Sequence, residues 1–150
     1  MLRLSKLTDY GTVVLAHMAR HPQTMHTAAD IAERTHLAVP TVSKLLKLFA
    51  KGGLVHSYRG ARGGYRLTRK PEEITAVQII DAVEGPVAIT ECSMSDGHCN
   101  LEPVCAIGHN WQRISLGIRD ALKTVSLAEL AGPMAPPPVS FKAAPRARAR

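Results

Sequence analysis

The sequence predicts a mainly α-helical fold with one small β-hairpin, followed by a long helix. Three observations lead to this expectation. Residues 8–50 contain three stretches with apolar residues at helical spacing, residues 54–68 read as two short strands around a glycine-rich turn, and an amphipathic pattern runs over 107–130. A length of 150 residues favours one domain with appendages. The expected boundaries are 1–85, 86–106, 107–130 and 131–150.

The first half should hold three helices. We expect the first over 8–20 with Thr8 as its N-cap, and the second from Thr27, its cap, to Thr35. Pro40 stands near the start of the third, where its missing N–H costs nothing, and the helix runs to Ala50. Apolar residues of the third helix occupy one face. Its outer face is left with Thr41, Ser43, Lys44, Lys47 and Lys51.

A tight link between the second and third helices, with a basic face on the third, predicts a helix-turn-helix whose last helix enters the DNA major groove. Residues 54–58 and 65–68 then form a hairpin, which makes the domain over 1–85 a winged helix-turn-helix. Arg59 and Arg62 lie at its glycine-rich tip, where a guanidinium can reach a phosphate or the narrow minor groove.

The second half has a different character. A core-packing helix is expected from Ile74 to Val83, capped near Thr75, and a cysteine-rich loop over 86–106. The apolar stripe of the helix over 107–130 exceeds what a monomer's surface helix needs, so it predicts a homodimer suited to a two-fold symmetric operator. Residues 131–150 lack periodicity and are expected to be a disordered basic tail.

Charge supports a double-stranded DNA partner. Residues 1–70 carry 12 Lys and Arg against three Asp and Glu, whereas residues 71–130 carry three against nine. No apolar run suits a membrane span and no signal peptide is evident, so the protein is expected in the cytoplasm. Phosphate-binding glycine motifs, nucleophile elbows and paired acid and base residues are also missing, which argues against an enzyme or a small-molecule substrate.

Three cysteines, Cys92, Cys99 and Cys105, lie within the loop over 86–106. An odd, clustered set suits metal binding in a reducing compartment better than a disulfide scaffold. Structural zinc sites usually contain closer cysteine pairs, whereas this looser spacing suits an iron–sulfur cluster with a fourth, non-thiolate ligand. Zinc and three unligated core cysteines remain the alternatives.

The chain resembles the Rrf-two family of winged-helix regulators over residues 1–131. The resemblance is carried by the opening segment 1–11, by Ala29-Asp30-Ile31-Ala32, by Gly53-Leu54-Val55, by Arg59-Gly60, by residues 63–67 and by the three cysteines. Within the family, the opening and the cysteine loop are most similar to regulators of the SUF system for iron–sulfur cluster assembly.

The resemblance implies that the three cysteines ligate a cluster, that the third helix reads the major groove and that Arg59 reaches the minor groove. Assembly regulators of the family commonly place a His three residues after the last Cys; Gly108 stands there and His109 follows it. Nitric-oxide-sensing relatives instead use an Asp of the other subunit's first helix, which corresponds to Asp9. His109 would favour a 2Fe-2S cluster, the preferred expectation, and Asp9 a 4Fe-4S cluster.

The expected function is a homodimeric repressor that senses iron–sulfur cluster status and controls cluster-assembly genes. Two alternatives stay open at this point. One is a nitric-oxide or redox sensor with the same ligands, and the other is a zinc-stabilised structural DNA-binding protein with little sequence preference.

Overall fold

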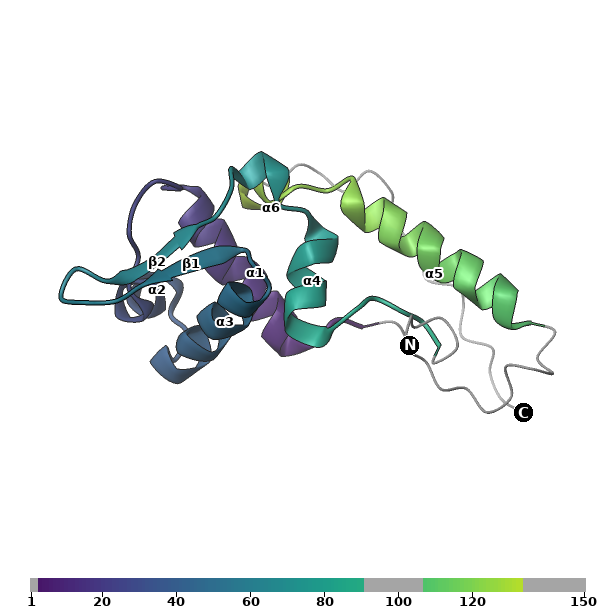
Figure 1. The fold of residues 1–150 in the computed structure, drawn as a ribbon, viewed down its shortest axis with the longest axis horizontal. Coiled ribbons are helices and arrows are strands. Elements are labelled where there is room, and N and C mark those ends of the chain that lie inside the picture. Colours follow the sequence, from purple (N-terminus) through teal and green to yellow (C-terminus); the bar gives the residue numbers. More distant parts are fainter. Residues whose placement is uncertain (1–2, 91–106, 134–150) are drawn as a thin grey trace, which may run out of the picture.

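The computed structural model describes residues 3–90 and 107–133. Cys92, Cys99 and Cys105, and the tail beyond 133, lie outside the described residues. The expected mainly α-helical fold with a small hairpin is confirmed (Figure 1). The elements are α1 (Lys6–Ala19), α2 (Ala28–Thr35), α3 (Val39–Lys51), β1 (Val55–Tyr58), β2 (Gly64–Leu67), the 3-10 turn η1 (Pro71–Glu73), α4 (Ala76–Glu84), α5 (Gly108–Lys123) and α6 (Leu127–Ala131).

Helix α1 begins before the expected residue. Ser5, not Thr8, is the N-cap, and its side chain accepts a hydrogen bond from the Thr8 amide at 3.2 Å. Thr8 is instead fully buried inside the first turn, where its hydroxyl donates to the Glu84 carboxylate at the end of α4. The prediction of Thr8 as the cap was wrong because a contact 76 residues away along the chain occupies its hydroxyl.

Helices α2 and α3 form the predicted helix-turn-helix. Thr27 is the N-cap of α2 as expected, in a reciprocal capping box with Asp30. The link turns at His36, whose φ of 56° is in the left-handed region that only a few non-glycine residue types, histidine among them, adopt with any frequency. The inner face of α3 is fully buried and packs against α1, where a Cβ on Gly11 would lie 2.8 Å from Phe49 Cζ.

The hairpin is antiparallel, and its register runs from Val55 opposite Leu67 to Tyr58 opposite Gly64. A second contact attaches it to the loop before α2, because the His26 amide donates to the Tyr65 carbonyl at 2.9 Å and the Tyr65 amide donates to the His26 carbonyl at 2.7 Å. Gly64 permits this approach, since its φ is 154° and a Cβ there would lie 2.6 Å from the His26 oxygen. The wing is therefore anchored at its base.

The interval 107–130 contains two helices rather than one. α5 ends at Lys123, and α6 begins after Ser126, which forms a capping box with Glu129. Leu127 is fully buried in the core, where α6 packs against α1, and its amide donates to the Ile74 carbonyl at 2.7 Å. In Figure 1, α6 lies at the top of the winged-helix body, and α5 extends from it on the side away from the wing. The long helix is thus tethered to the winged helix at its C-terminal end.

Candidate functional site

The outer face of α3 forms one part of the candidate nucleic-acid interface. Lys44 and Lys47 are exposed, whereas Thr41 and Ser43 are half-buried on the same helix. A shallow groove runs along this face, and α3 contains no acidic residue to offset its lysines. The groove is lined by Pro40, Ser43, Lys44, Lys47, Leu48 and Lys51. This surface combines hydroxyl groups with cations, as DNA base edges and phosphates require.

The wing tip forms the other part. Arg59 and Arg62 are both exposed in the turn between β1 and β2. Gly60 adopts φ 105°, and a Cβ on Gly63 would collide with the Tyr58 carbonyl oxygen, so this tight turn requires glycine at both positions. Figure 1 shows the hairpin projecting from the body at the end opposite α5. The two arginines are thus presented away from the body of the protein.

Sequence reasoning missed a third arginine of the wing. The Arg66 guanidinium lies 5.5 Å from the centroid of the Tyr58 ring, and its Nη2 donates to the Tyr58 hydroxyl at 3.1 Å. Arg66 lies opposite His56, two residues before Tyr58 on the neighbouring strand, so strand alternation places both side chains on one face. That alternation was the available signal. Arg66 is held against its own hairpin, whereas Arg59 and Arg62 at the tip form no ion pair with any carboxylate in the described part of the chain.

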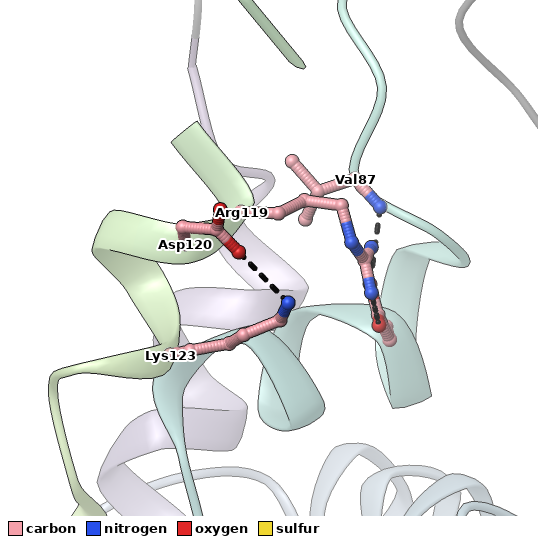
Figure 2. A network of polar contacts seen from close by, with 5 residues as sticks. Val87, Arg119, Asp120 and Lys123 are labelled. Carbon is pink, nitrogen blue, oxygen red and sulfur yellow. Dashed lines mark hydrogen bonds and ion pairs between the residues drawn. The ribbon is translucent and has the colours of Figure 1, made fainter. Parts of the chain in front are cut away.

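Asp81 of α4 holds both flanks of the segment that contains the cysteines. Its carboxylate accepts two hydrogen bonds from Arg119 of α5, at 2.9 and 2.8 Å, and a third from the Val87 amide at 3.0 Å. Figure 2 shows Arg119 and Val87 converging from the two chain segments. The buried Ser115 hydroxyl adds a bond from the Ile89 amide at 3.2 Å. The chain entering and the helix leaving residues 91–106 are thus fixed to the winged helix.

Glu84, one turn further along α4, fixes the start of α1. Its carboxylate accepts hydrogen bonds from the Ser5 amide at 2.9 Å and from the Thr8 hydroxyl. The Thr8 bond, followed by the Ser5 bond, holds the pKa of Glu84 below its usual value. Asp9 lies in the same first turn of α1 and is exposed. Its position relative to α4 is therefore set by the Glu84 contacts.

The expected metal ligands are not brought together within the described chain. Asp9 and His109 are both exposed, in the first turns of α1 and α5, and the starts of these helices lie apart in Figure 1. The three cysteines lie outside the described residues. Within residues 3–90 and 107–133, no cluster of three His, Cys, Asp or Glu side chains is placed to hold a metal ion.

Comparison with known proteins establishes the family. Residues 4–133 match Rrf2, described as an iron-dependent transcriptional regulator. The chain belongs to the Rrf2 (Rrf-two) family. It is 34% identical to the HTH-type transcriptional regulator IscR of Aliivibrio salmonicida over 130 residues. This alignment covers 86% of this chain and 77% of that protein. Protein rrf2 of Nitratidesulfovibrio vulgaris is 31% identical, over 86% of this chain and 87% of its own.

Solved structures of this Rrf2-family regulator's relatives share its fold. CymR, the global cysteine regulator of B. subtilis, superposes with a TM-score of 0.66 at 29% identity, over 87% of this chain and 97% of that one. T. potens IscR gives a TM-score of 0.61 at 30% identity, over 86% and 85% of the two chains. These relatives are transcriptional regulators, and the Rrf2-family protein is accordingly a DNA-binding transcription regulator and not an enzyme. Within its described ranges, no helix is long and apolar enough to cross a membrane.

The Asp81–Arg119 pair of this Rrf2-family protein should have a measurable energy. Both side chains are about three-quarters buried, at 28% and 25% exposed, and the geometry is bidentate. In a double-mutant cycle with Asp81→Asn and Arg119→Gln, we expect a coupling energy of about 1.5–3 kcal/mol from urea unfolding. The exposed Asp120–Lys123 pair on the same helix is the control, and its coupling should stay below about 0.5 kcal/mol. Equal coupling for the two pairs would contradict the anchoring role of Asp81.

Glu84 should make the Rrf2-family protein sensitive to acid. Its pKa is lowered in the folded state from the usual 4.5, so the unfolded state binds the proton first. The stability that Glu84 contributes is therefore present above about pH 4.5 and is lost as the pH falls through the folded-state pKa. We expect Glu84→Gln to flatten the fall in unfolding free energy between about pH 5 and pH 3. Glu72→Gln, at an exposed residue of η1, should leave that slope unchanged.

Proposed function

We propose that this regulator senses iron–sulfur cluster status through Cys92, Cys99 and Cys105 and represses genes for cluster assembly. The observation that carries the proposal is the position of the cysteines. All three fall within residues 91–106, whose two flanks are fixed to α4 by Asp81 and by its partner Arg119. The helix α4 also holds the start of α1 through Glu84. A change in the order of the cysteine segment would therefore be transmitted through α4 to the DNA-binding domain.

The residue types suit a cluster. Cysteine thiolates are the usual ligands of iron–sulfur clusters, and the six- and five-residue intervals are wider than the tight pairs of structural zinc sites. The family description, an iron-dependent regulator, and the likeness to proteins named IscR favour iron over zinc. A bound cluster would supply a redox-sensitive and iron-dependent constraint on the segment. The chain's own contribution is to fix both ends of that segment.

Two residues are candidates for the fourth ligand. His109 is exposed in the first turn of α5, directly after the cysteine segment, and this short sequence distance favours it and with it a 2Fe-2S cluster. Asp9 lies in the first turn of α1. Within one subunit, the start of α1 lies apart from the start of α5 (Figure 1). The cysteines would therefore be reached by Asp9 of the partner subunit, which favours a 4Fe-4S cluster. Replacing each residue by Ala and recording the cluster's spectrum separates the two arrangements.

The exposed face of α5 supports the proposal of a homodimer. Ile107, Trp111 and Ile114 are 58%, 38% and 45% exposed, and their spacing aligns them in one stripe along the helix. On α1, Tyr10 and Val13 are also exposed, next to Asp9. Exposed apolar side chains at regular helical spacing are typical of a partner interface. We propose that two copies bury these faces against each other and so present two recognition helices to a symmetric operator.

Two substitutions on α5 of the full chain test the dimer. Ile114→Glu places a charge in the stripe, and we expect the protein to sediment as a monomer at micromolar concentration. Leu116→Glu is the matched control, since Leu116 is 59% exposed and, at 3.6 residues per turn, lies about half a turn round the helix from the stripe. The control should remain a dimer. An Ile114→Glu protein that sediments as a dimer would contradict the proposed seam.

Each interface residue has a proposed role on DNA. Thr41 and Ser43, near the N-terminal end of α3, would contact base edges in the major groove, while Lys44 and Lys47 would contact phosphates. Arg59 and Arg62 would enter the adjacent minor groove from the wing tip. In the dimer, the two α3 helices would reach half-sites about one helical turn apart.

The function is tested by measuring operator binding at graded iron supply. We propose that the protein acts in the cytoplasm on its double-stranded operator. Selection from random DNA should recover a two-fold symmetric site, and its affinity should differ between cluster-loaded and cluster-free protein. A response to nitric oxide or peroxide at constant iron supply would instead favour the sensor alternative. Binding without sequence preference would favour the structural alternative and overturn the proposal.

A further inference from the structure

We propose that a basic pocket between the end of α1 and α2 binds a tetrahedral oxyanion of the phosphate type. The pocket has a volume of about 560 Å³ and lies outside the DNA-contact residues and the cysteine segment described above. Its basic lining comes from the last turn of α1, the loop after it, and α2 with its C-cap. The basic residues are His17, Arg20, His21, His26, Arg34 and His36.

Basic side chains predominate in the lining of this pocket. Arg20 and Arg34 are both exposed. Among the described residues, neither has a carboxylate within 4.0 Å of its guanidinium group. Burial, followed by the neighbouring His26, Arg34, Arg20 and His21, lowers the pKa of His17. Two acids also line the pocket, Asp30 and Glu33, but the Asp30 carboxylate is engaged by the Thr27 hydroxyl at 2.6 Å. Six basic side chains therefore line the pocket against two acids, and neither arginine is held in an ion pair among the described residues.

The arrangement favours an anion over a metal ion. His26 Nε2 donates to the His21 carbonyl oxygen at 3.1 Å, which occupies one of its two ring nitrogens. The rings of His17 and His26 meet edge to face at 5.5 Å, and among the described residues no three ligating side chains are placed to hold a metal ion. Guanidinium groups repel cations and bind tetrahedral oxyanions with paired donors. Thr24 adds a hydroxyl to the pocket.

An occupied pocket would act on the wing. His26 lies in its wall and is also the residue whose backbone pairs with Tyr65 of β2. A ligand that moves or orders His26 would therefore act directly on the hairpin that carries Arg59 and Arg62, because the backbone of His26 is hydrogen-bonded to that hairpin. The oxyanion could come from the DNA backbone or from a free solute. The chemistry of recognition is the same for both sources, and the experiment distinguishes them.

The test uses inorganic sulfate, a tetrahedral dianion whose charge is constant between about pH 6 and pH 8, at fixed ionic strength balanced with chloride. NMR titration should give saturable shifts at His17 and His26, with at least about fivefold weaker binding in Arg20→Gln/Arg34→Gln. Arg69→Gln/Arg113→Gln, with the same net charge, is the control. Non-saturable binding, or equal loss in the control, would overturn the proposal.

Operator binding separates the two sources. If the pocket takes a DNA phosphate, the Arg20→Gln/Arg34→Gln variant should lose about one unit from the salt-dependence slope of operator affinity without any sulfate. If it takes a free anion, the variant should keep the wild-type slope, and sulfate should change operator affinity only in the wild-type protein. Either result supports an oxyanion site. A variant that matches the wild type in the slope and in its response to sulfate would contradict it.

Discussion

Replacing Lys44 and Lys47 with Ala is expected to weaken operator binding by about 10- to 100-fold at physiological salt. Both side chains are exposed on the outer face of α3, and neither has a carboxylate partner among the residues described. Each lysine that neutralises a phosphate releases counterions, so the slope of log affinity against log salt should fall by about one per residue. Fluorescence anisotropy with labelled operator across a salt series measures both quantities.

The control for this experiment is a second pair of exposed lysines. Lys70→Ala/Lys123→Ala removes the same net charge outside α3 and the wing tip, and its salt slope should stay within about half a unit of the wild type. Alanine is a strong helix former, so the α3 variant should fold with unchanged helix content. If both pairs reduce the affinity and slope equally, α3 is not the DNA-contact helix and the interface proposed here is wrong.

The largest regulatory effect is expected from the cysteines. A Cys92→Ala/Cys99→Ala/Cys105→Ala variant removes every thiol of the chain and with them the proposed cluster ligands. We expect its operator occupancy to be the same in iron-replete and iron-limited cells, whereas the wild-type occupancy changes with iron. Chromatin immunoprecipitation at the operator measures this difference.

The same segment offers a matched control for the cysteine variant. Ser93→Ala/Ser95→Ala/Asn100→Ala alters three polar residues between the cysteines and leaves every thiol in place. It should respond to iron as the wild type does. A triple cysteine variant that still responds to iron would refute the sensor role while leaving DNA binding intact.

Local signals predicted most of the winged helix. Thr27 with Asp30 is a capping box that precedes an apolar pattern, and the two glycines before Tyr65 mark the wing turn, so both elements are found where they were expected. Local signals failed at Ser5 and Thr8, because both are good N-caps and only the distant Glu84 decides between them. Choices of this kind depend on tertiary contacts.

The C-terminal half was harder to predict for two reasons. The apolar stripe continues smoothly through Val125, which predicts one long helix, although Ser126 and Glu129 have the spacing of a capping box that could have marked the break. The Asp81–Arg119 pair is 38 residues apart in sequence, and no periodicity relates the two residues. The basic pocket has the same character, since its histidines have no motif spacing and converge only through the packing of α1 against α2.

The central claim is tested most directly by purifying the protein without oxygen, recording its absorption spectrum and measuring iron, acid-labile sulfide and zinc. The account predicts visible absorption bands with iron and sulfide in equal amounts, all lost in the triple cysteine variant. A colourless wild-type protein that contains stoichiometric zinc would contradict it, and the cysteine segment would then be a zinc site of a DNA-binding dimer.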